Sequence, residues 1–79
     1  MEEIYQFNNI DLKGKKVEIL EVNLIKNTKL KLERIGIFPG RIVEILDDNL
    51  KNIKIFKINN VKYAIRTNDA KDIIVKKVN

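Results

Sequence analysis

The chain has 79 residues, a formal net charge of +5, and neither cysteine nor histidine. These absences exclude disulfides and thiolate metal sites, and they remove the usual general base and the commonest transition-metal ligand. Isoleucine and valine supply 20 of the residues and only five residues are aromatic, which favours a small β-barrel over a helical bundle. We therefore expect residues 1–79 to form a single all-β domain.

The positive charge is spread along the whole chain and is not gathered in one block. Thirteen lysines stand against three arginines, although arginine is the residue preferred for forked contacts to phosphates and bases. A solvated basic surface is therefore favoured over a nucleic-acid footprint. No apolar run approaches the roughly 20 residues of a membrane span, and the acidic start Met1-Glu2-Glu3 does not resemble a signal peptide. These features predict a soluble cytoplasmic protein with no direct membrane insertion.

The N-terminal part of the chain predicts an arm, a turn and one strand. Residues 1–9 lack a clear period and are expected to form an N-terminal arm or an edge strand. The sequence Lys-Gly-Lys at residues 13–15 predicts a turn. Residues 16–22 then alternate as a strand, and the alternation breaks near Glu21.

A short helix is expected next, after a polar stretch that begins at Asn23. Asn27 or Thr28 is the candidate N-cap. The helix is rich in lysine and too short to be stable on its own. We expect it to form because Leu32 and Ile35 plug an open end of the barrel.

The helix is expected to end at a glycine, and a tight turn follows. Gly36 stands where a helix end requires a left-handed residue, and Ile37 is the apolar residue that packs back. Pro39 and Gly40 are typical of the middle of a type II turn, in which proline fixes φ and glycine takes the positive φ.

Two further strands follow this turn. In residues 41–46 the pattern directs Arg41 and Glu44 mostly to solvent. Residues 52–58 have an ambiguous phase, which either a bulge near Ile55-Phe56 or burial of both faces would explain.

The C-terminal part predicts a hairpin and a closing strand. Asn59-Asn60 indicates a two-residue hairpin turn, since asparagine tolerates positive φ. Residues 61–66 return, a single helical turn starts at Thr67 with Asn68 as its cap, and residues 73–78 close the sheet. The expected architecture is five or six antiparallel strands with one short helix.

The run from Leu32 to Ile45, L-x-x-I-G-I-x-P-G-x-x-V-x-I, resembles the signature of the FeoA family. Upstream, Gly14 to Ile19 is similar to that family's opening G-x-x-V-x-I strand. Downstream, residues 63–66 and 69–75 are similar to its last strands. The chain departs from the family at Asn59-Asn60, where a glycine is commoner.

The resemblance implies a small SH3-like β-barrel that accompanies the ferrous-iron transporter FeoB. A related barrel lies at the C-terminus of some metal-dependent repressors. The expected function is therefore a non-enzymatic accessory protein that docks on the FeoB GTPase-coupled transporter and modulates it. The alternative is a nucleic-acid-associated SH3-like barrel, or a stand-alone relative of the repressor C-terminal domain. The sequence leaves the oligomeric state open.

The residues themselves predict no catalytic, cofactor or metal site. The chain has no serine, and neither Thr28 nor Thr67 has a neighbouring base to activate it. No glycine-rich phosphate loop is present. The candidate metal ligands are carboxylates, which suit hard cations better than a selective ferrous site: Glu44, Asp47, Asp48, Asp69 and Asp72.

The predicted partner surface is the helix with the turn after it. Lys29, Lys31 and Arg34 bring positive charge there, and Phe38 adds an aromatic residue that the turn does not require. The competing interpretation is that Phe38 caps the barrel core and the basic residues are only solvated. The next candidates are the strand faces around three lysines: Lys54, Lys57 and Lys62.

Overall fold

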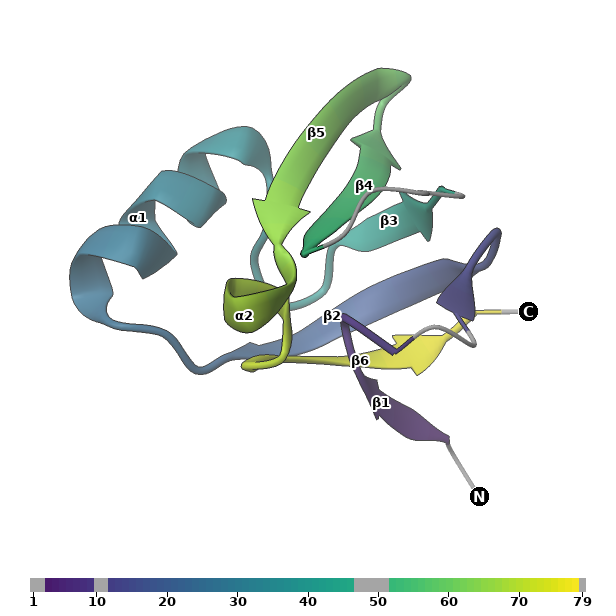
Figure 1. The fold of residues 1–79 in the computed structure, drawn as a ribbon, viewed down its shortest axis with the longest axis horizontal. Helices are drawn as coiled ribbons and strands as arrows, with labels where there is room; N and C mark the ends of the chain where they lie inside the picture. The colour runs from purple at the N-terminus through teal and green to yellow at the C-terminus, as the bar shows by residue number, and fades with distance from the viewer. Residues whose placement is uncertain (1–2, 10–11, 47–51, 79) are drawn as a thin grey trace.

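The computed structural model describes residues 3–9, 12–46 and 52–78, which form the strongly bent, open barrel of Figure 1. The strands are β1 (Ile4–Gln6), β2 (Lys16–Val22), β3 (Ile42–Ile45), β4 (Ile53–Ile58), β5 (Val61–Arg66) and β6 (Ile73–Lys77). The helices are α1 (Lys26–Ile35) and α2 (Thr67–Ala70). The strands pair antiparallel in the order β1-β6-β2-β3-β4-β5. The predicted all-β, SH3-like architecture is confirmed.

Apolar side chains from strands, turns and α1 fill the inside of the bend. The ring of Phe56 lies at the centre: Phe7 meets it edge-on at 5.5 Å and Tyr63 stacks on it at 5.7 Å between ring centroids. From α1, Leu32 is buried and Ile35 is partly buried against this core, as predicted. The helix is therefore held in place by packing against the barrel.

The N-terminal segment belongs to the sheet. β1 pairs with β6, placing Tyr5 opposite Val75, and forms one edge of the sheet. The Lys77 ammonium lies 5.2 Å from the centroid of the Tyr5 ring. Directly after β1, Phe7 donates its N–H to the carbonyl of Ile73 at 2.9 Å, and its side chain is completely buried. Of the two alternatives for this segment, the edge strand is the one observed.

The bulge lies in β2 and not in β4. The pairing of β2 with β6 shifts between Ile19 and Glu21, where the alternation was expected to break. β4 pairs with β5 without any shift, so the bulge suggested near Ile55-Phe56 is wrong. The phase was ambiguous because Ile53 and Ile55 are half-buried on the outer face. The inner face holds two apolar side chains and, against expectation, a lysine: Phe56, Ile58 and Lys54.

Both helix starts differ from the expectation. α1 is preceded by Ile25 as its N-cap residue, so Asn27 and Thr28 lie within the helix. Arg66 is the N-cap residue of α2, in place of Asn68. Neither N-cap residue makes a side-chain capping hydrogen bond. Ile25 is 74% exposed, so water can satisfy the first N–H groups of α1 without a side-chain cap.

The hairpin between β4 and β5 is confirmed. Asn59 and Asn60 have φ of 50° and 67°, as a type I′ turn requires at both central positions. This turn sets the register of β5 on β4 from Ile58–Val61 to Ile53–Arg66.

The buried Phe7 predicts that residues before β2 stabilise the barrel. Replacing a fully buried phenylalanine by alanine costs about 3–5 kcal/mol of unfolding free energy, and we expect Phe7→Ala to fall in that range. Ile4→Ala is the matched control, because Ile4 is 61% exposed, and its effect should stay within about 0.5 kcal/mol. Urea unfolding of both variants measures this. Equal effects would contradict the assigned packing of Phe7.

Candidate functional site

The described residues present one surface feature at the end of α1 and another on the outer face of the sheet. They contain no group of three acidic side chains close enough to hold a metal ion, and cysteine and histidine are missing from the chain. Of the candidate ligands, Asp47 and Asp48 lie outside the described residues, and Glu44 pairs with Lys57. No helix in the described ranges is long and apolar enough to cross a membrane.

The first surface begins where α1 ends. Gly36 has φ of 107°, in the left-handed region, and its N–H donates to the carbonyl of Glu33 at 3.1 Å. The N–H of Ile37 donates to the carbonyl of Leu32 at 2.8 Å, which completes a Schellman motif. Ile37 is then completely buried. The predicted helix stop is confirmed in both its backbone and its packing.

The turn after α1 is tied to the neighbouring strand β2. The N–H of Arg41 donates to the carbonyl of Phe38 at 3.1 Å, and Gly40 has φ of 97°, as expected of a type II turn over Pro39-Gly40. Two hydrogen bonds of 2.8 Å join this turn to Ile19. The N–H of Gly40 donates to the carbonyl of Ile19, and the N–H of Ile19 donates to the carbonyl of Arg41. These bonds hold the turn rigidly against the barrel.

Arg41 lies against the turn, although the strand pattern directed it to solvent. Its guanidinium carbon is 5.4 Å from the centroid of the Phe38 ring, a cation–π contact. A Cβ at Gly36 would lie 3.1 Å from Arg41 Nη2 and 3.3 Å from its Nε. That Nε is buried and has no hydrogen-bond acceptor within the part of the chain that the structure describes. Arg41 thus fills the space above Gly36 and holds the Phe38 ring.

The residues of the predicted surface lie on two neighbouring segments. Lys31 and Arg34 are exposed and three positions apart in α1, so they share one face of the helix, while Lys29 is half-buried. Phe38 is 40% exposed and lies outside the buried core. Its cation–π partner is Arg41, which the sequence pattern did not point to.

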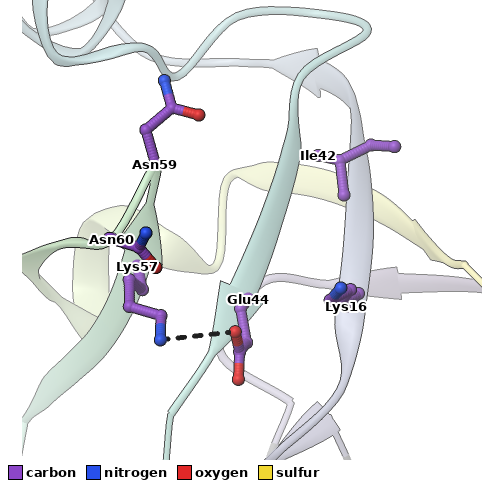
Figure 2. A pocket seen from close by; sticks show the side chains of 6 residues that line it. All are labelled: Lys16, Ile42, Glu44, Lys57, Asn59 and Asn60. Carbon is purple, nitrogen blue, oxygen red and sulfur yellow. Dashed lines mark ion pairs between the residues drawn. The ribbon is translucent and has the colours of Figure 1, made fainter.

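A second surface lies on the outer face of β2, β3 and β4. It forms a depression with a volume of about 200 Å³. Figure 2 shows the side chains that line it. Cross-strand register brings its charges together, because Lys16 faces Glu44 on β3 and Glu44 faces Lys57 on β4. Lys57 Nζ lies 3.8 Å from Glu44 Oε1, and Figure 2 marks this ion pair. The depression is lined by Lys16, Ile42, Glu44, Lys57, Asn59 and Asn60.

The same register extends the charged row onto β5. Lys62 lies directly opposite Lys57, so three lysines and a single glutamate cross four strands in one line. The Lys57–Glu44 pair is about one-third exposed, and such pairs contribute at most about 1 kcal/mol. Sequence reasoning named Lys57 and Lys62 as candidates but missed their alignment with Lys16 and Glu44, because these residues are distant in the chain. The Asn59-Asn60 turn was the signal that could have placed Lys57 opposite Lys62.

The crowding above Gly36 predicts that the three glycines at positive φ differ in their tolerance of a side chain. Alanine at positive φ costs about 1–2 kcal/mol, and at Gly36 displacement of Arg41 should add about 1 kcal/mol. Gly40→Ala is the matched control, since its Cβ would meet nothing within 4 Å. In thermal or urea unfolding, Gly36→Val and Gly36→Ala should therefore be less stable than Gly40→Ala. The same loss at both positions would contradict the crowding.

Comparison with solved structures shows a shared fold. A crystal structure of an iron uptake regulatory protein (FeoA) aligns with a TM-score of 0.82 at 21% identity, over 96% of this chain and 99% of that one. The solution structure of a FeoA-like protein from Clostridium acetobutylicum aligns with a TM-score of 0.80 at 19% identity, over 100% of this chain and 92% of that one. ScaR with bound Zn²⁺ aligns at 0.79 and 17% identity, over 94% of this chain and 37% of that chain. The curated proteins give no sequence match.

The sequence itself matches a family model. The model described as the FeoA domain matches residues 12–77, from the end of the N-terminal segment to the last residue of β6. This range includes α1, the turn at Pro39-Gly40 and the β4–β5 hairpin. The chain therefore belongs to the FeoA domain family.

Proposed function

We propose that this FeoA-domain protein is a cytoplasmic, non-enzymatic accessory protein of ferrous iron uptake, which docks on a FeoB-type transporter and modulates its transport or GTPase activity. Membership of the FeoA family supports the link to iron transport. A docking role also suits the chemistry of the chain, which has no histidine or cysteine with which to carry ferrous iron. In this proposal the partner provides nucleotide binding and the path across the membrane.

The observation that carries the proposal is the exposed ring of Phe38, held by Arg41 on a turn fixed to the barrel. Aromatic and arginine side chains are the commonest anchors of protein interfaces. The contact with Arg41 restricts the ring, and a restricted side chain loses less entropy on binding. Ile42, immediately after the turn, is 50% exposed and adds apolar area. Lys31 and Arg34 supply charge on the adjacent helix.

The alternative is a nucleic-acid-associated barrel. The fold shared with part of ScaR favours considering it, although that similarity shows the fold alone. Three arginines in the chain give little forked phosphate recognition, and one of them, Arg41, is engaged with Phe38. Binding to DNA or RNA that falls steeply with added salt would support this alternative over the transporter.

The proposed surface predicts separate effects of its charge and of its aromatic residue. Arg34→Ala and Phe38→Ala should each weaken retention of a FeoB-type transporter in a pull-down, the latter by about thirtyfold or more for an anchor worth about 2 kcal/mol. Lys71→Ala and Ile4→Ala are controls at exposed positions outside this surface. Thermal melts accompany each variant. Full binding by Arg34→Ala, with Phe38→Ala losing binding only in step with stability, would place the interface elsewhere.

The donor set also predicts that the isolated protein binds no ferrous iron tightly. Exposed carboxylates give weak association that disappears with added salt. Anaerobic calorimetric titration with Fe²⁺ should therefore show no saturable binding near micromolar concentration. A micromolar dissociation constant at physiological salt would show that the protein carries iron itself.

A further inference from the structure

The edge of β5 is an unpaired strand edge with a defined hydrogen-bonding pattern. β5 is the last strand of the sheet and pairs only with β4 among the described strands. A two-residue loop makes Ile58 and Val61 a hydrogen-bonded pair, and such pairs alternate along an antiparallel ladder. The N–H of Thr67 donates to the carbonyl of Asn52 at 3.0 Å, as this alternation requires. The residues whose N–H and C=O point away from β4 are therefore Lys62, Ala64 and Arg66.

The side chains of the same residues lie on the outer face of the sheet. Lys62 and Arg66 are both exposed, and Lys57 lies opposite Lys62 on β4. Residues 52–66 contain no acidic residue, and among the described strand pairs the carboxylate nearest to Lys62 in register is Glu44 of β3. Backbone donors and acceptors are thus lined by positive charge that β4 and β5 do not neutralise. We define Lys57, Lys62, Ala64 and Arg66 as the β5 edge site.

We propose that the β5 edge site binds an acidic, extended segment of a partner protein as an added strand. Its backbone would pair with the free N–H and C=O groups of Lys62 and Ala64, as in β-strand addition. Carboxylates on the segment's outward-facing residues would then meet Lys57, Lys62 and Arg66. Figure 1 shows β5 at the far side of the barrel from β1, which forms the other sheet edge. The site does not include Phe38 or the α1 surface, so the inference stands independently of the transporter proposal.

Charge and side-chain direction select this occupant over two others. A second copy of the chain, paired through β5, would bring Lys62 and Arg66 against their own like charges. A single-stranded nucleic acid needs aromatic platforms for its bases. The aromatic residue of β5, Tyr63, faces inward and stacks on Phe56. An acidic polypeptide requires only backbone N–H and C=O groups and basic side chains, and the β5 edge presents both.

A depression at the end of β5 adds a second feature to the site. It has a volume of about 330 Å³ and lies on the same outer face, where Ile53 faces Arg66. Its lining combines the apolar Ile53 with polar groups of Asn52, Arg66, Thr67 and Asn68. An apolar side chain near one end of the segment would fit there. The matching segment is therefore acidic over about the length of β5, with an apolar residue at the end beside Arg66.

The test uses a blocked synthetic peptide with alternating glutamate and valine, and a control peptide with glutamine in place of each glutamate. Amide resonances of the whole protein are followed by NMR as each peptide is added. The acidic peptide should shift the amides of Lys62, Ala64 and Arg66 first, and its affinity should fall with added salt. Equal affinity of the glutamine peptide would overturn the proposal, as would shifts confined to α1.

Two variants separate the backbone contribution from the charge contribution. Ala64→Pro removes the free N–H at an edge position that accepts proline and should abolish binding, whereas Ala64→Ser retains that N–H and should bind normally. Lys62→Glu should weaken the acidic peptide by more than the roughly two- to fivefold loss of a single exposed pair, because it adds repulsion. Lys71→Glu is its control. Thermal melts identify any variant that fails to fold. If Ala64→Pro fails to fold, the comparison of Lys62→Glu with Lys71→Glu tests the proposal.

Three further outcomes would also refute the inference. The first is retention of acidic-peptide binding by a folded Ala64→Pro variant, since the added strand needs that N–H. The second is tighter binding of a thymidine oligonucleotide than of the acidic peptide, which would make the edge a nucleic-acid site. The third is a dimer in sedimentation that Lys62→Glu strengthens, which would assign the edge to a second copy of the chain.

Discussion

The structure depends on one backbone constraint, the left-handed conformation at Gly36. With φ of 107° and the Arg41 guanidinium 3.1 Å from where a Cβ would lie, any side chain at this position is strained. The reversal sends Ile37 into the core and leaves the next residues to form the turn that hydrogen-bonds to Ile19. The direction of α1, the start of β3 and the position of the Phe38 ring all follow from that reversal.

Folding redistributes a charge that is evenly spread in the sequence. Cross-strand pairs place Glu18 within 3.8 Å of Lys76 and Glu44 within 3.8 Å of Lys57, and Glu3 lies 3.9 Å from Lys77. These paired acidic residues lie on β2, on β3 and just before β1. No acidic residue is present in β4, its hairpin turn or β5. The positive charge of the outer face is therefore concentrated toward the free edge of β5. Composition alone argued against a basic patch, and the sheet register creates one.

The two candidate surfaces suit different kinds of contact. The α1–turn surface presents a fixed aromatic ring beside exposed charge, which favours a folded partner with a matching pocket. The β5 edge presents backbone groups lined by lysine and arginine, which favours an extended segment. Under the two proposals, the barrel would contact two parts of one partner, which suits the proposed accessory role.

The sequence by itself determined the local structure. Gly36, Pro39-Gly40 and Asn59-Asn60 specify backbone conformations that few residues tolerate, so the helix end, the turn and the hairpin could be predicted. Alternation placed Val17 and Ile19 in the core, and the motif around these turns indicated the family. Only the tertiary structure decided the rest. The Arg41 guanidinium lies beside the Phe38 ring although the strand pattern directed it to solvent, and Lys54 is buried on the inner face of β4. The rows of charge arise from register between strands, which no local pattern contains.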